Sequence, residues 1–83
     1  MAASGLTRDQ RRRVVGDVLR LLREERGIRQ EDVAVHLGAP QSFVSKYETG
    51  QRSLDFLEVR DVCDVLRVRL DEFVQRLDLR MKR

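Results

Sequence analysis

Residues 30–48 read QEDVAVHLGAPQSFVSKYE and decide the fold of this chain. The stretch holds two helix-forming segments, residues 30–37 and residues 41–48, with Gly38 between them. Gly38 can adopt the positive φ of a sharp turn without steric cost, and Pro40 suits the start of a new helix. The apolar spacing of the two segments predicts a buried side made of Val33, Ala34, Leu37, Val44 and Tyr47.

Two short helices joined by such a turn form a helix-turn-helix, in which the helices cross at roughly 90–120°. With Val44 and Tyr47 facing inward, the opposite side of the second helix is polar. Its amide, hydroxyl and ammonium groups suit the major groove of DNA, where such groups can read base edges. We therefore expect base contacts from Gln41, Ser42, Ser45 and Lys46.

The other segments are also predicted to be helical. A capping-box sequence at residues 7–10 and an apolar stripe at helical spacing predict a first helix over about residues 8–25. Ser53 is expected to cap a fourth helix, and a fifth helix is expected from Asp71 to about Leu77. No segment alternates with the period of two that strands require. The predicted fold class is all-α, a compact domain of five helices.

The chain of 83 residues is short enough for a single small domain. We expect residues 7–79 to form a helix-turn-helix domain with its motif at residues 30–48. Residues 1–6 are small or polar and lack a capping signal, so they are predicted to be a disordered tail. Residues 80–83 are predicted to be a basic C-terminal tail.

The composition excludes several classes of protein. No run approaches the roughly 18 apolar residues that a membrane span needs, and no apolar segment typical of a secretion signal follows the first residue. His36 and Cys63 are the chain's single histidine and single cysteine, and neither lies in a catalytic or metal-binding motif. We expect a protein of the cytoplasm that is not an enzyme, with no catalytic residue, metal or cofactor and no membrane partner.

The basic residues are unevenly distributed. Residues 1–53 carry ten basic and seven acidic side chains, whereas residues 54–83 carry seven of each. The excess of positive charge in the first part of the chain indicates a polyanionic partner. The run Arg11-Arg12-Arg13 is interpreted first as a solvated helix face, with a contact to DNA or to an acidic protein as the alternative.

Residues 14–77 resemble the helix-turn-helix family of the phage lambda and 434 repressors and their Cro proteins, often called the Xre family. The resemblance lies in three stretches: LREERGIRQEDVAVHLG at residues 22–38, QSFVSKYETGQRS at residues 41–53 and VCDVLRVRLDEF at residues 62–73. It implies a lambda-repressor-like fold, binding to double-stranded DNA and a prokaryotic or phage origin. Arg67 departs from the family, because many members have a helix-ending glycine there.

The resemblance also implies roles for single residues. Gln41 and Ser42 match the base-reading pair of lambda-type members, and Lys46 matches another position that faces bases. Arg23 and Glu48 match a structural ion pair. Arg29 replaces the usual cap of the second helix and adds a cation near DNA, and Phe43 is either a half-buried strut or a contact to a thymine methyl group. The expected phosphate-contacting set is Arg29, Gln30, Phe43, Thr49, Gln51 and Arg52.

These observations predict a sequence-specific transcriptional regulator, a repressor or an autoregulator. The alternative is a protein-interaction module of the same fold, such as an antitoxin or a coactivator, with a protein partner. A single recognition helix reads few base pairs, so we expect a homodimer on an inverted-repeat operator. Its interface is expected to use Val74, Leu77 and Leu79, unless these residues only close the core of a monomer.

Overall fold

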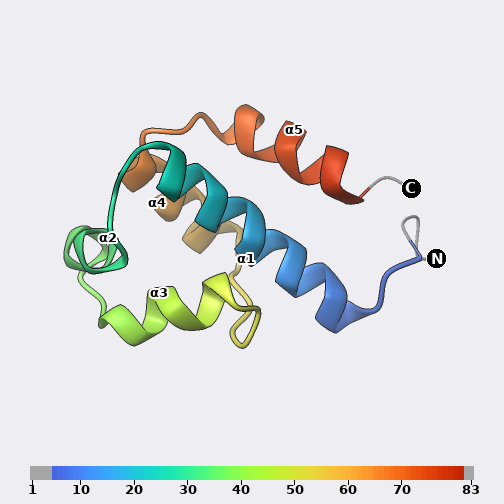
Figure 1. Cartoon of the computed structure of the whole chain (residues 1–83), viewed down its shortest axis with the longest axis horizontal. Coiled ribbons are helices and arrows are strands. Elements are labelled where there is room, and N and C mark those ends of the chain that lie inside the picture. Colours follow the sequence, from blue (N-terminus) through green and yellow to red (C-terminus); the bar gives the residue numbers. More distant parts are fainter. Residues whose placement is uncertain (1–4, 82–83) are drawn as a thin grey trace.

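The computed structural model describes residues 5–81, and this part of the chain contains five α-helices and no strand. Residues 1–4 of the predicted N-terminal tail and residues 82–83 of the predicted C-terminal tail lie outside it. The all-α prediction is confirmed. The helices are α1 (Arg8–Glu25), α2 (Gln30–Leu37), α3 (Gln41–Glu48), α4 (Phe56–Leu66) and α5 (Leu70–Met81) (Figure 1).

Helix α1 is the longest element and runs through the middle of the molecule, with α3 along one side and α5 along the other (Figure 1). It begins at the predicted capping box, in which the Thr7 hydroxyl accepts a hydrogen bond from the Gln10 amide. The core lies between α1 and the other four helices. Its fully buried side chains include Val18, Leu19, Leu22, Val33, Val44, Tyr47, Val62, Cys63 and Leu66. None of the helices in residues 5–81 combines the length and the apolar character that crossing a lipid bilayer requires.

Gly16 lets α1 and α3 approach each other closely. A Cβ atom at Gly16 would lie 2.1 Å from the carbonyl oxygen of Tyr47 and 2.8 Å from that of Glu48. No side chain fits in that space, so the backbones of the two helices are in direct contact at this point. Nothing in the sequence distinguishes Gly16, because it lies within an ordinary apolar stripe.

Helix α4 begins two residues later than predicted, since its cap is Asp55 and not Ser53. The Asp55 carboxylate accepts a hydrogen bond of 2.7 Å from the Glu58 amide, and the Glu58 carboxylate accepts one of 3.0 Å from the Asp55 amide. This reciprocal pair needs an acid three residues after the cap. Ser53 has no such partner, because Phe56 is three residues beyond it.

Arg67 ends α4 in the left-handed conformation, with φ 58° and ψ 41°. It is the only non-glycine residue with positive φ among residues 5–81. The turn is closed by a hydrogen bond of 2.9 Å from the Val68 amide to the Cys63 carbonyl, and the Val68 side chain is buried. Helix α4 therefore ends in a conformation that usually favours glycine, and the Arg67 side chain adds steric strain there.

Helix α5 is longer than predicted, because it begins at Leu70 and continues past Leu77 to Met81. Its last turn is held against α1 by ion pairs that the sequence pattern did not reveal. Arg80 binds Asp17, and Arg76 binds Glu25 at 2.7 Å. Arg80 and Met81, which were predicted to belong to the basic tail, are thus part of the helix.

Candidate nucleic-acid interface

The turn between α2 and α3 has the predicted geometry. Gly38 adopts the left-handed conformation, with φ 67° and ψ 35°, and the Ala39 amide donates a hydrogen bond of 3.0 Å to the Ala34 carbonyl. Val44 and Tyr47 are buried as expected, and so are Val33 and Ala34, while Leu37 is partly buried against the same core. This packing determines which face of α3 remains outside.

The outer face of α3 carries the four side chains expected to read bases. Gln41, Ser42 and Lys46 are exposed, and Ser45 is half-buried. Helix α3 lies at the edge of the molecule, with one side against α1 and α2 (Figure 1). The outer side of α3 is therefore a short polar surface, and the opposite side of the helix is fixed by its packing against α1 and α2.

Arg23 and Glu48 lie in contact and form a bidentate ion pair between α1 and the end of α3. The Nε of Arg23 is 2.7 Å from Oε2 of Glu48, and Nη2 is 3.1 Å from Oε1. The side chains of Arg23 and Glu48 are only 12% and 2% exposed. The hydrogen bond to Glu48 raises the pKa of Arg23 above its ordinary value, and Nη1 of Arg23 also donates to the Ile28 carbonyl.

A chain of hydrogen bonds connects this pair to the start of α3. The Gln30 amide nitrogen donates to Oε1 of Glu48 at 2.8 Å, and the Gln41 amide nitrogen donates to Oε1 of Gln30 at 3.0 Å. The Glu48 carboxylate thus accepts three hydrogen bonds, which compensate its burial. Gln30 and Gln41 are consequently oriented by groups inside the fold.

Arg52 and Phe43 lie together on the flank of α3. The guanidinium carbon of Arg52 is 4.7 Å from the centre of the Phe43 ring, and the guanidinium binds both Glu58 oxygens at 3.1 and 3.3 Å. The Phe43 ring meets that of Tyr47 edge to face, with the centres 5.5 Å apart. Phe43 is half-buried, which favours the strut among its predicted roles.

The loop after α3 folds back on the last turn of that helix. The amides of Gln51 and Arg52 donate to the Lys46 carbonyl at 2.9 and 3.2 Å. The Thr49 hydroxyl donates to the Ser45 carbonyl at 3.0 Å. Thr49, Gln51 and Arg52 are all exposed, so three of the expected phosphate contacts lie on one short loop beside α3.

Arg29 stands apart from that loop, at the start of α2. It makes no capping hydrogen bond with its side chain. Its Nε instead lies 3.2 Å from the carboxylate of Asp32, and this hydrogen bond lowers the pKa of Asp32 below its ordinary value. The cation expected at this position is therefore already paired within the protein.

The three residues expected at a dimer interface do not form one patch. Leu77 is packed against the core, whereas Val74 and Leu79 are 49% and 71% exposed. Val74 and Leu79 are five positions apart in the sequence, which places them roughly 140° apart around the helix. Val74 lines a groove with Cys63 of α4, while Leu79 lines a pocket with Val18 and Leu21 of α1. Because Val74 and Leu79 lie on different flanks of α5, a single dimer interface can be centred on only one of them.

Comparison with known proteins matches residues 14–76 to the family described as the helix-turn-helix domain. No curated protein sequence matches the chain significantly. Among solved structures, the clp gene regulator ClgR from C. glutamicum is similar with a TM-score of 0.81 and 20% identity, over 86% of this chain and 92% of that one. A mutant of the restriction-modification controller protein C.Esp1396I is similar with a TM-score of 0.79 and 25% identity, over 86% and 95%.

The family match covers both helices of the motif, the loop after α3 and most of α5. The two solved structures share the arrangement of the helices over nearly their full lengths. The lambda-repressor-like fold expected from the resemblance is thereby confirmed. The chain belongs to the helix-turn-helix domain family.

Proposed function

We propose that this protein is a transcription regulator that binds double-stranded DNA sequence-specifically, with α3 in the major groove. The proposal rests above all on the hydrogen bond from Gln41 to Gln30, which continues through Glu48 to the buried Arg23. A base-reading amide is most selective when its orientation is set before DNA binds. Gln41 contacts bases from this prepared position, together with Ser42, Ser45 and Lys46.

Phosphate contacts on both sides of α3 hold the helix in the groove. Gln30 lies on one side, and Thr49, Gln51 and Arg52 lie on the other. Phe43 contributes indirectly, because the Arg52 guanidinium stacks on its ring and is positioned by this contact. Arg29 reaches a phosphate by exchanging its ion pair with Asp32, since a pair so open to solvent is weak.

The named roles of the similar structures support a role in regulation. One is named as a clp gene regulator and the other as a restriction-modification controller. We infer that this chain acts as a repressor or an autoregulator in the cytoplasm. A protein bound to an operator can block transcription by DNA binding alone. Repression of this kind requires neither an enzymatic activity nor a site for an inducer.

We infer further that the protein binds an inverted repeat as a homodimer. Two recognition helices reach successive major grooves when they are about 34 Å apart. The Val74 flank of α5 is the better candidate for the interface. It borders a groove of about 700 Å³ whose apolar lining includes Cys63, Val68 and Leu70.

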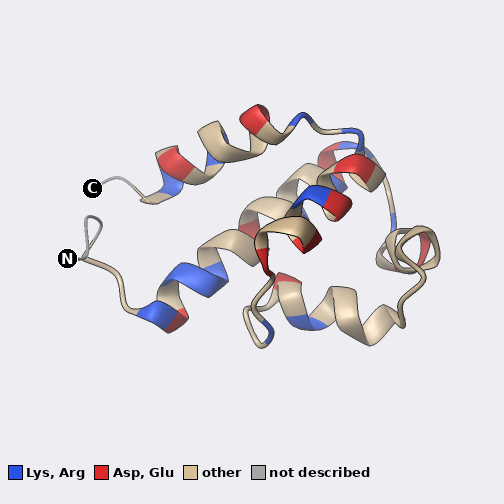
Figure 2. Ribbon diagram, turned by 180° about the vertical axis from the view of Figure 1, so that it is seen from behind, with Lys and Arg blue, Asp and Glu red and all other residues tan. Residues whose placement is uncertain are grey.

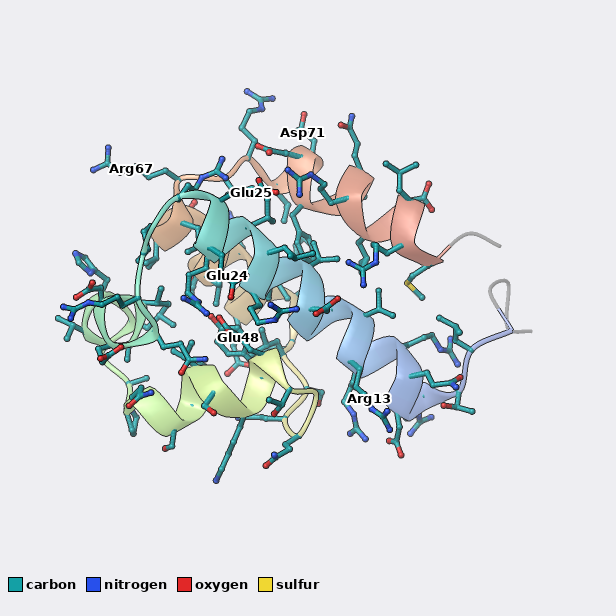
Figure 3. The ribbon with its side chains drawn as sticks, in the orientation of Figure 1. Arg13, Glu24, Glu25, Glu48, Arg67 and Asp71 are labelled. Atoms are coloured by element: carbon teal, nitrogen blue, oxygen red, sulfur yellow. The ribbon has the colours of Figure 1, made fainter. Side chains whose placement is uncertain are left out.

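Selection of bound duplexes from a random DNA library tests the function directly. The wild-type protein should enrich a short inverted repeat whose half-sites are centred about 10 base pairs apart. Gln41→Ala should enrich a degenerate site or none. Arg67→Gln is the control, because its side chain is exposed and lies on the opposite side of the molecule from α3 (Figure 3). Enrichment of no sequence by the wild type would reject the proposed sequence specificity.

A further inference from the structure

The first turns of α1 are strongly basic, and part of this charge faces α3. Figure 2 shows the concentration of Lys and Arg positions along this end of α1. Arg13 lies three residues before Gly16, the point where α1 touches α3, so both are on the same side of the helix. Arg11 lies five residues before Gly16 and points to another side. Only some members of the arginine run therefore face α3.

Arg13 lies directly against the loop that follows α3. A Cβ atom at Gly50 would be 2.6 Å from Cγ and 3.0 Å from Cα of Arg13. Gly50 has φ +82°, so its conformation and its lack of a side chain both suit this close approach. Figure 3 shows Arg13 on the edge of α1 that faces the same side of the molecule as α3.

The Arg13 guanidinium is free within the part of the chain that the structure describes. It is exposed and takes part in no ion pair or side-chain hydrogen bond there. Its basic neighbours on this side are already paired: Arg12 with Asp9, and Arg20 with Asp17. Arg13 therefore offers an uncompensated positive charge beside the exposed residues of the loop.

A groove of about 400 Å³ lies at the same place. Its lining consists of Arg13, Val14, Asp17, Glu48, Thr49 and Arg80. Both carboxylates in it are neutralised within the fold. Glu48 is bound by Arg23 and Gln30, and hydrogen bonds from Arg20 and Arg80 lower the pKa of Asp17 below its ordinary value. The groove thus presents Arg13 and the Thr49 region to an anion without an opposing free carboxylate.

We propose that Arg13 binds a backbone phosphate of DNA and extends the contacts of residues 49–52 onto α1. This inference rests on the proposed DNA binding and adds a contact outside the bases that α3 reads. A guanidinium can bind a phosphate through two parallel hydrogen bonds. The contact carries no sequence information, because every nucleotide supplies the same phosphate. It increases the affinity for selected and unselected DNA alike.

The test compares the salt dependence of binding for three variants. Arg13→Gln removes the charge but keeps the Cβ and Cγ against which Gly50 lies, and Arg13→Lys keeps the charge. Arg67→Gln removes an exposed charge at the opposite end of the molecule (Figure 3). Affinity is measured by fluorescence anisotropy between about 50 and 200 mM salt. The probes are the selected duplex and an unselected duplex, each about 30 base pairs or three turns long.

For each protomer bound, Arg13→Gln should reduce the slope of log affinity against log salt by about 0.9 and weaken binding to both duplexes about tenfold near 0.1 M salt. Arg13→Lys and Arg67→Gln should retain the wild-type slope. Thermal unfolding of each variant establishes that it is folded. An unchanged slope for a folded Arg13→Gln protein overturns the inference but leaves the proposed function intact. A wild-type protein that binds neither duplex overturns both.

Discussion

Arg23 and Glu48 join α1 to the end of α3 through two hydrogen bonds of 2.7 and 3.1 Å, and both side chains are largely removed from water. The pair also reaches the face that we propose contacts DNA, because Glu48 accepts a hydrogen bond from the Gln30 side chain. A disturbance of the pair should therefore reach Gln41, the first residue of α3.

Glu48→Gln should lower the free energy of unfolding by about 3–5 kcal/mol, because it leaves the buried Arg23 guanidinium without its counter-charge. Urea unfolding monitored by circular dichroism measures the loss. The control is Arg69→Gln, which breaks the exposed pair between Arg69 and Asp71 and should leave the urea midpoint close to that of the wild type. Equal midpoints for Glu48→Gln and the wild type would show that the pair contributes little.

Base reading and phosphate binding should respond differently to mutation. Gln41→Ala should cost about 1–3 kcal/mol on the selected duplex and much less on unselected DNA. Arg52→Ala should weaken binding to both duplexes and reduce the salt slope by about one unit for each protomer bound. Titrations on both duplexes at several salt concentrations separate the two effects. If Gln41→Ala weakens binding to both duplexes equally, α3 is not the reading helix.

Gly16→Ala should destabilise the fold, because the added methyl group would lie within 2.1 Å of the Tyr47 carbonyl oxygen. Overpacking of this kind costs about 1–3 kcal/mol, and rigid backbone on both sides places this site at the upper end. Thermal unfolding measures the change. Arg11→Ala introduces the same residue at an exposed position of α1 and should melt close to the wild type. A Gly16→Ala protein as stable as the control would contradict the close contact.

Arg67→Gly should stabilise the protein by about 0.5–1 kcal/mol, because glycine adopts the left-handed conformation without the steric cost that Arg67 carries. The gain is smaller than the strain itself, since glycine is also more flexible in the unfolded chain. Arg67→Ala, which keeps a Cβ atom, should give no such gain. Urea unfolding of both variants checks this. A higher midpoint for Arg67→Gly alone indicates relief of backbone strain, whereas equal increases for both variants would indicate that only the loss of charge matters.

If the inferred homodimer uses the Val74 flank of α5, Val74→Asp should be a folded monomer that binds the selected duplex far more weakly than the wild type. Leu79→Asp should leave the dimer intact, because Leu79 lies on the other flank of α5, beside α1. Sedimentation velocity of both variants and of the wild type, with and without DNA, measures the oligomeric state. The inferred dimer is excluded if the wild type stays monomeric in both conditions.

Local patterns in the sequence were sufficient for most of the fold. The capping box at residues 7–10, the apolar spacing of α1 and the glycine turn at Gly38 each depend on neighbouring residues, so all three could be predicted. The inward position of Val44 and Tyr47 followed from the same periodicity. Less regular signals were less informative: Ser53 and Asp55 both suit a helix cap, and only the reciprocal bonds with Glu58 distinguish them.

The tertiary structure decided what depends on residues far apart in the chain. Gly16 is unremarkable in sequence, and its role follows from the two carbonyl oxygens that α3 places against it. Arg80 extends α5 because Asp17 lies opposite it on α1. Arg13 meets Gly50 only after α1 and α3 have packed. A sequence determines local backbone preferences through neighbouring residues, whereas contacts between helices depend on how the whole core is filled.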